Sequence, residues 1–149
     1  MDIVRLSVPG SLRYRDVVLR VVASCCRLMR SMAMGKQEPS REQHQFDDEV
    51  VSAVGEAFNN VAIHAYRDLS PGAVDLEIEL RSDSITIRMS DTGRRFEPSV
   101  QRSPDLASLP ESHMGLFIVR SFMDQVTYRP GAVAAAPNVL TLTKRYVAS

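Results

Sequence analysis

The apolar residues of this chain change their spacing at the pair Pro71-Gly72, and this change constrains the fold more than any other feature of the sequence. Within 12–33 and 46–67, before the pair, they recur every three or four positions, which is the period of amphipathic helices with one buried face. After it they alternate with polar residues over 73–81 and 85–89, which predicts two strands joined as a hairpin through Ser82-Asp83. Helices followed by a hairpin favour packing of helices on a sheet.

Two helices are predicted before the change of period. The first spans about 12–33 and follows a candidate N-cap, Ser11, and the second spans about 46–67. Between them, 34–45 is polar and contains Gly and Pro, which predicts a surface connection. The apolar stripes expected in the core are Val18, Val21, Val22, Cys25, Leu28, Met29 and Met32 on the first helix, and Val50, Val54, Ala57, Phe58, Val61 and Ala65 on the second.

The other predicted elements are a strand at 2–8, a helix beginning near Gly115, and strands near 125–129 and 138–146. The stretch 91–114 has no clear period, and so long a loop inside a compact domain is usually functional or disordered. This order of elements predicts a single α+β domain over residues 1–149. We expect a two-layer sandwich with helices on one face of a mixed, largely antiparallel sheet.

Composition excludes several classes of protein. The 149 residues carry no formal net charge, which argues against a nucleic-acid binder that relies on bulk positive charge. No apolar run approaches the ~20 residues that span a bilayer, and the N-terminus lacks a signal-peptide pattern, so we expect a cytoplasmic protein without a membrane partner. The two cysteines, Cys25 and Cys26, are adjacent on a predicted helix, so we expect helix packing rather than a disulfide.

A first polar segment, EAFNNVAIHAY, lies on the second predicted helix. At about 100° per residue, Glu56, Asn59 and Asn60 cluster on the side opposite the apolar stripe. Such a face is often only solvated, yet Asn is a poor residue in mid-helix and two in succession need a reason. An Asn carboxamide oxygen is a hard ligand suited to Mg²⁺, and a Glu one turn earlier can act on a nearby water or hydroxyl.

Two further segments lie at the ends of predicted elements. In DTGRRF, Asp91 can accept a hydrogen bond from an exocyclic amine and Gly93 lets the backbone approach a flat base, although an ordinary Asp-containing turn has the same pattern. In HMGL, Gly115 at a helix N-terminus offers N–H groups to phosphate oxygens, and the alternative is a simple capping role.

Together the three segments resemble the N box and the two Gly boxes of the GHKL ATPases, which include gyrase, Hsp90, histidine kinases and mismatch-repair proteins. EAFNNVAIHAY, DTGRRFEP and GLFIVRSFMDQVTY are most similar to the anti-sigma-factor serine/threonine kinases of that superfamily. The resemblance covers about residues 3–146. It implies the histidine-kinase-like ATPase fold, with ATP and Mg²⁺ as cofactors.

The resemblance also implies roles for single residues. Asn60 would bind the Mg²⁺ that bridges the ATP phosphates, and Glu56 would position or deprotonate the acceptor hydroxyl. Asp91 would read the adenine amine, with Gly93 beneath the base. The other candidate nucleotide contacts are Asn59, His64, His113 and Gly115, of which Gly115 would face the phosphates. For His64, and for Tyr66 beside it, the alternative is packing and capping at the helix end.

The sequence departs from the family pattern at two positions. Arg95 stands where many members have a second Gly, but the anti-sigma subgroup often lacks this Gly as well. His113 occupies the first Gly of the usual Gly-x-Gly, where its side chain would crowd the phosphates or donate a hydrogen bond to one of them. Both interpretations remain open. The stretch between Phe96 and His113 would be the ATP lid, with Arg94 and Arg102 in or beside it.

The function implied by the resemblance is that of an anti-sigma factor in a partner-switching system. Such a protein sequesters a sigma factor and phosphorylates a small anti-anti-sigma (STAS-type) protein on Ser or Thr, acts as a homodimer and makes no direct contact with nucleic acid. One alternative is an interaction protein of the same fold, non-catalytic or weakly ATP-binding, with a different signalling partner. A histidine-kinase fragment would need a phosphoacceptor His in an upstream helical hairpin, whereas His44 lies in the polar connection.

Overall fold

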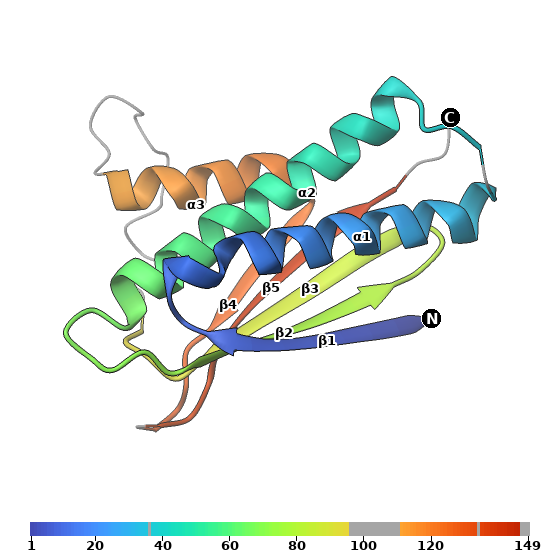
Figure 1. Cartoon of the computed structure of the whole chain (residues 1–149). Coiled ribbons are helices and arrows are strands. Elements are labelled where there is room, and N and C mark those ends of the chain that lie inside the picture. The colour runs from blue at the N-terminus through green and yellow to red at the C-terminus, as the bar shows by residue number, and fades with distance from the viewer. Residues whose placement is uncertain (36, 96–110, 134, 147–149) are drawn as a thin grey trace.

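The computed structural model of the chain is a two-layer α+β sandwich, as the sequence predicts (Figure 1). It describes residues 1–35, 37–95, 111–133 and 135–146, with the backbone alone at 34 and 111–116. The helices of this part of the chain cover one face of a five-stranded sheet of order β1-β2-β3-β5-β4. Every strand pairing is antiparallel, so the sheet of the described residues is not mixed.

The strands and helices follow the predicted order. The strands are β1 (Asp2–Pro9), β2 (Ala73–Leu80), β3 (Ser84–Asp91), β4 (Gln125–Arg129) and β5 (Asn138–Arg145). The helices are α1 (Arg15–Met34), which follows the 3₁₀ turn η1 (Leu12–Tyr14), α2 (Arg41–Asn60), which continues into the π-helical turn η2 (Val61–Ala65), and α3 (Glu111–Phe122). Ser11 caps η1, since its side chain accepts a hydrogen bond from the Arg13 amide.

The core lies between the helices and the sheet. The inward residues of β2 and β3 are buried, as is the whole predicted stripe of α2 and η2. On α1 the prediction is wrong at two positions, because Leu28 is 54% exposed and Met32 is 44% exposed. Cys26 packs in the core instead, and burial with the nearby Asp47 charge raises the pKa of its thiol to about 12. A thiol with so high a pKa is unreactive, which agrees with a packing role.

Helix α2 begins at Arg41, earlier than the predicted start near 46, so the surface connection is shorter than expected. Its start is a capping box: the Ser40 hydroxyl accepts from the Gln43 amide at 3.3 Å, and the Gln43 side chain accepts from the Ser40 amide at 2.7 Å. Gln43 is also buried and donates to the Tyr146 hydroxyl at 2.7 Å. The pattern Ser-x-x-Gln was therefore the sequence signal for the true start of the helix.

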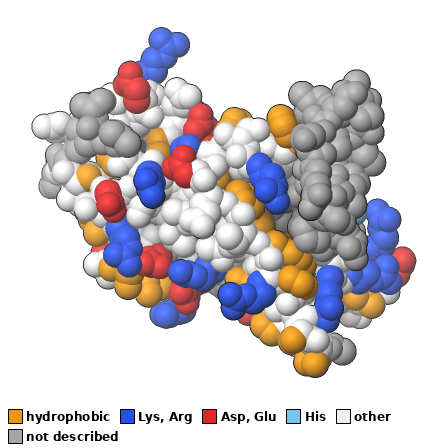
Figure 2. Space-filling view, turned by 180° about the vertical axis from the view of Figure 1, so that it is seen from behind, with side chains coloured by type: hydrophobic (Ala, Val, Ile, Leu, Met, Phe, Trp, Pro, Cys, Tyr) orange, Lys and Arg blue, Asp and Glu red, His pale blue; other side chains and the backbone are white. Residues whose placement is uncertain are grey.

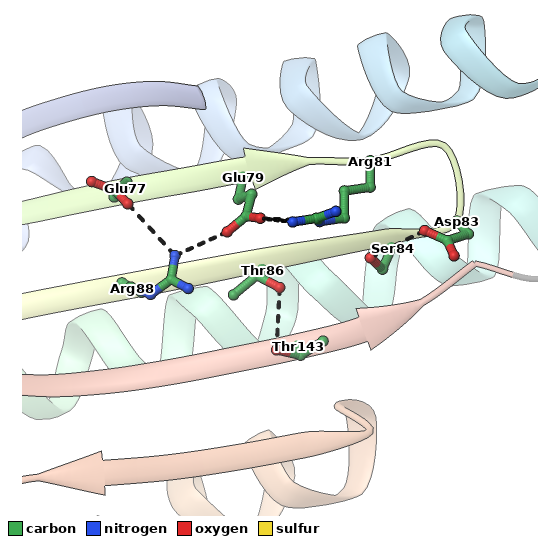
Figure 3. A network of polar contacts seen from close by, with 8 residues as sticks. All are labelled: Glu77, Glu79, Arg81, Asp83, Ser84, Thr86, Arg88 and Thr143. Atoms are coloured by element: carbon green, nitrogen blue, oxygen red, sulfur yellow. Dashed lines mark hydrogen bonds and ion pairs between the residues drawn. The ribbon is translucent and has the colours of Figure 1, made fainter. Parts of the chain in front are cut away.

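The face of the sheet away from the helices is polar, which explains the acidic residues that alternate along β2. Arg88 on β3 reaches Glu77 at 3.5 Å and Glu79 at 3.1 Å, and Arg81 binds Glu79 at 2.8 Å (Figure 3). The hydrogen bonds from Arg81 and Arg88 lower the pKa of the Glu79 carboxyl. Cross-strand pairs of opposite charge support the observed strand register.

The surface has mixed charge. Seen from behind, Lys and Arg side chains are spread among acidic and apolar ones rather than gathered in one patch (Figure 2). Among the described residues, no helix combines the length and apolar character needed to cross a membrane.

The capping box gives a test of the fold. Ser40→Ala should lower the free energy of unfolding by about 1 kcal/mol, because the Gln43 amide loses its acceptor. Urea denaturation followed by circular dichroism measures the change. Ser52→Ala, at an exposed position of the same helix, is the matched control and should change stability by less than about 0.5 kcal/mol. Equal stability losses in the two variants would contradict the capping role.

Candidate nucleotide site

The second half of α2 presents two polar side chains that the fold does not use. Glu56 and Asn60 lie one turn apart and are half-buried on the side away from the core stripe. Neither side chain makes a hydrogen bond or ion pair with another described residue. Buried and half-buried polar groups normally find partners in the protein or in solvent, so this pair is available to a ligand.

Asn59 differs from its two neighbours. Its Oδ1 accepts a hydrogen bond from Nε of Arg15, on α1, at 2.9 Å. The guanidinium lies beside Gly55, where a Cβ would stand only 2.6 Å from Nη2. The predicted cluster therefore divides, with Glu56 and Asn60 open and the Asn59 oxygen occupied by α1. Its role as a nucleotide contact stays a prediction.

Asp91, at the end of β3, is buried and held by two hydrogen bonds. Its Oδ1 accepts from the Gly93 amide at 2.9 Å and from Nδ2 of Asn138 at 3.1 Å. No described residue donates to Oδ2. Burial raises the pKa of the Asp91 carboxyl, while the bonds from Asn138 and Gly93 act in the opposite direction. The carboxylate is thus fixed in place, with one oxygen left for a ligand.

Asn138 was missed by the sequence analysis. It opens β5 directly opposite Asp91 in the strand register and is 2% exposed. The available signal was an Asn inside a predicted strand, where this residue type is disfavoured. Such a residue needs a polar partner, and the antiparallel pairing of β3 with β5 supplies it.

The structure explains why position 93 must be a glycine, which the sequence did not reveal. A Cβ at this position would collide with the backbone carbonyl of Ala65, in η2, and the next amide, that of Arg94, donates to the same carbonyl at 2.7 Å. Tyr66 adds a second link, since its hydroxyl accepts from the Thr92 amide at 3.1 Å and donates to the Ala73 carbonyl at 3.0 Å. These contacts fix the turn after β3 against η2 and the residue that follows it.

The remaining candidates are placed only in part. His64 is half-buried within η2. Helix α3 begins at Glu111 rather than near Gly115, so His113 and Gly115 fall inside the helix and their side chains lie outside the described residues. The stretch 96–110, which contains Arg102 and most of the predicted lid, also lies outside them.

Few of the described residues offer oxygen atoms to a metal ion at this site. They contain no group of three or more His, Cys, Asp or Glu side chains that could hold a metal ion. Mg²⁺ commonly takes one or two protein oxygens and completes its shell with substrate phosphates and water. The open oxygen of Asn60 is of the kind that Mg²⁺ takes, and Oδ2 of Asp91 can accept from an amine donor.

Comparisons with known proteins find one matching domain family and several similar chains. The family model of the histidine kinase-like ATPase domain matches residues 15–144. The chain is 29% identical over 157 aligned positions to the serine-protein kinase RsbW of Staphylococcus aureus, covering 98% of this chain and 87% of the relative. The RsbW of strain MRSA252 is 30% identical over 137 positions, covering 85% and 78%. The anti-sigma F factor of Clostridium beijerinckii is 34% identical over 84 positions, covering 52% and 57%.

The buried carboxyl gives a pH-dependent prediction. Because the pKa of Asp91 is raised in the folded state, its stabilising contribution is present below the ordinary value of 3.8 and is lost as pH rises through the raised value. Asp91→Asn cannot ionise and keeps an acceptor oxygen. Its unfolding free energy minus that of the wild type should therefore increase with pH above 3.8 and then level off.

Urea denaturation at pH steps between about 3 and 7 measures this difference. Asp75→Asn, at an exposed position of β2, reports what a carboxyl contributes outside the core. A difference for Asp91→Asn that falls with increasing pH would show that the folded protein favours the ionised carboxyl.

Proposed function

We propose a function from the premise that the chain belongs to the histidine kinase-like ATPase domain family, whose model matches residues 15–144. The protein binds ATP with Mg²⁺ and transfers the terminal phosphoryl group to a Ser or Thr of a small anti-anti-sigma (STAS-type) protein. The main support is the open pair Glu56 and Asn60, which lie one turn apart on the side of α2 away from the core stripe. The names of the relatives, serine-protein kinase and anti-sigma F factor, support the same class of activity.

Each residue has a distinct task in this proposal. Asn60 supplies a neutral oxygen to Mg²⁺, and Glu56 orients the acceptor hydroxyl or takes its proton. Asp91 accepts a hydrogen bond from the adenine amine through Oδ2. Gly115 and His64 stay candidates for the phosphates, although Gly115 lies inside α3 rather than at its N-terminus. Mg²⁺ neutralises charge on the phosphates, and phosphoryl transfer otherwise requires mainly positioning.

The proposed partners are proteins of the cytoplasm. A sigma factor would be sequestered, the anti-anti-sigma protein would be phosphorylated, and a second copy of the chain would form a homodimer. Among the described side chains of α1, the large apolar ones of Val17, Leu28 and Met32 are exposed, and they support a protein-binding role for this helix. Sedimentation equilibrium of the purified chain measures the dimer, and capture of bound proteins from the native cell identifies the other partners.

A second candidate function is that of an interaction protein with the same fold and weak or no ATP turnover. The observation that favours it is His113, which stands where the family usually has Gly. Titration with ATP, with and without Mg²⁺, separates the two functions.

The metal role of Asn60 is the central prediction. Asn60→Ala should abolish Mg²⁺-dependent ATP binding and leave the fold intact, because the side chain lies off the core stripe and makes no hydrogen bond or ion pair with another described residue. Isothermal titration calorimetry with Mg²⁺-ATP measures the affinity. Asn59→Ala is the neighbouring comparison and should cost less, because the Asn59 oxygen is bound to Arg15. Equal Mg²⁺-ATP affinity in the wild type and Asn60→Ala would remove Asn60 from the site.

His113→Gly separates two interpretations by the sign of one change. If the imidazole crowds the phosphates, the variant should bind ATP more tightly or turn it over faster. If it donates to a phosphate, the variant should bind more weakly, and wild-type affinity should fall as pH rises through the titration of the imidazole. We expect crowding, since the family functions with a bare Gly here. Weaker ATP binding by a folded His113→Gly variant would establish the donor role instead.

A further inference from the structure

Asn138 uses its whole side-chain amide to join three parts of the site. Its Oδ1 accepts from the Gly131 amide at 2.9 Å, in the turn between β4 and β5. Its Nδ2 donates to Oδ1 of Asp91 at 3.1 Å and to the Gly93 carbonyl at 3.0 Å. An amide nitrogen has two hydrogens, so both are used, and the bond from Gly131 fixes which end of the amide faces Asp91.

These bonds determine how Asp91 is presented. The terminal torsion of an Asp side chain is broad and roughly two-fold, so a carboxylate needs partners to keep one orientation. Asn138 and the Gly93 amide both engage Oδ1, and no described residue donates to Oδ2. The two oxygens are therefore made unequal, with one anchored in the protein and the other left for a donor on a ligand.

The hydrogen bond from Asn138 to Asp91 also favours the ionised form of Asp91, which is the form that recognition of an amine needs. An ionised carboxylate only accepts hydrogen bonds, whereas a protonated one donates as well. Burial raises the pKa of Asp91, and the hydrogen bond from Asn138 lowers it. Asn138 thus opposes the protonation that burial of the carboxyl promotes.

We propose that Asn138 is a positioning residue for base selection: it holds Asp91 so that Oδ2 meets the exocyclic amine of ATP. The inference rests on the nucleotide binding proposed above. It differs from a purely structural role, in which Asn138 would only close the turn at Gly131. Loss of a structural residue would weaken every nucleotide alike, whereas loss of a positioning residue weakens only ligands that carry the amine.

The experiment compares ATP with purine riboside 5′-triphosphate, which lacks only the exocyclic amine. Calorimetry with Mg²⁺ gives both affinities for the wild type and two variants. Asn138→Ala removes all three bonds, and Asn138→Leu removes the same bonds while it fills the space of the amide with a side chain that can neither donate nor accept. Gln43→Ala is the matched control, because Gln43 is also a buried amide but lies at the start of α2 and binds Tyr146.

The wild type and Gln43→Ala should prefer ATP by roughly tenfold or more, the scale of one buried hydrogen bond to a charged group. Both Asn138 variants should reduce this preference to about threefold or less, and change the affinity for the amine-free ligand by no more than about twofold. Circular dichroism confirms that each variant is folded, and Asn138→Leu decides the outcome if Asn138→Ala unfolds.

Three results would overturn the inference. An unchanged preference in a folded Asn138→Leu variant would show that Asp91 needs no help from Asn138. An equal loss for both ligands would assign Asn138 to the fold alone. A wild type that binds neither ligand would refute the proposed nucleotide binding, and this inference with it.

Discussion

The candidate site depends on a close backbone approach between the end of the α2 segment and the turn after β3. The Ala65 carbonyl accepts a hydrogen bond from the Arg94 amide at 2.7 Å. The residue before Arg94 must be Gly93, because a Cβ there would collide with the same carbonyl. This contact brings the helix that carries Glu56 and Asn60 to the strand end that carries Asp91. Helix and sheet could otherwise slide on their apolar faces, because the hydrophobic effect has no direction. The directional bonds of Ala65 and Tyr66 remove that freedom.

Helix α1 fixes α2 from the other side, and it does so with two arginines rather than with apolar contacts alone. Arg15 binds Asn59 near the site, and Arg30 forms an ion pair with Asp47 in the first half of α2. Both members of that pair are largely buried, with side chains 12% and 15% exposed. Buried ion pairs contribute little net stability because desolvation offsets the attraction, but they penalise any packing that separates them. The orientation of α2, and with it the direction of Asn60, is therefore specified at two points.

The sequence predicted the elements well because the two hydrophobic periods are distinct and each is carried by many residues. It failed where the structure depends on a single residue, or on a pair of residues far apart in the sequence. The start of α2 depends on Ser40 and Gln43, which read as part of a polar connection, and periodicity alone cannot tell the exposed Leu28 from a buried neighbour. Within the site, the residues on α2 and Asp91 could be named from local motifs. The partners that set their roles could not, because Arg15–Asn59 and Asp91–Asn138 join residues 44 and 47 positions apart.

The candidate site has two halves, the polar residues of α2 and Asp91 with its partners, and they differ in what they cost the fold. The α2 half keeps Glu56 and Asn60 half-buried and without a hydrogen bond to another described residue, so it costs the fold little and, in the proposed function, exchanges water for a metal ion and phosphates. The Asp91 half buries an ionisable carboxyl, which opposes folding when the group is charged. Such a cost persists only where neighbours reduce it, and Asn138 and the Gly93 amide do so through the anchored oxygen. In the proposed function, burial makes the remaining oxygen selective, since a ligand that offers no donor there leaves it without a partner in a place where water is scarce. The sheet is suited to this task because the antiparallel register of β3 and β5 sets Asn138 directly opposite Asp91.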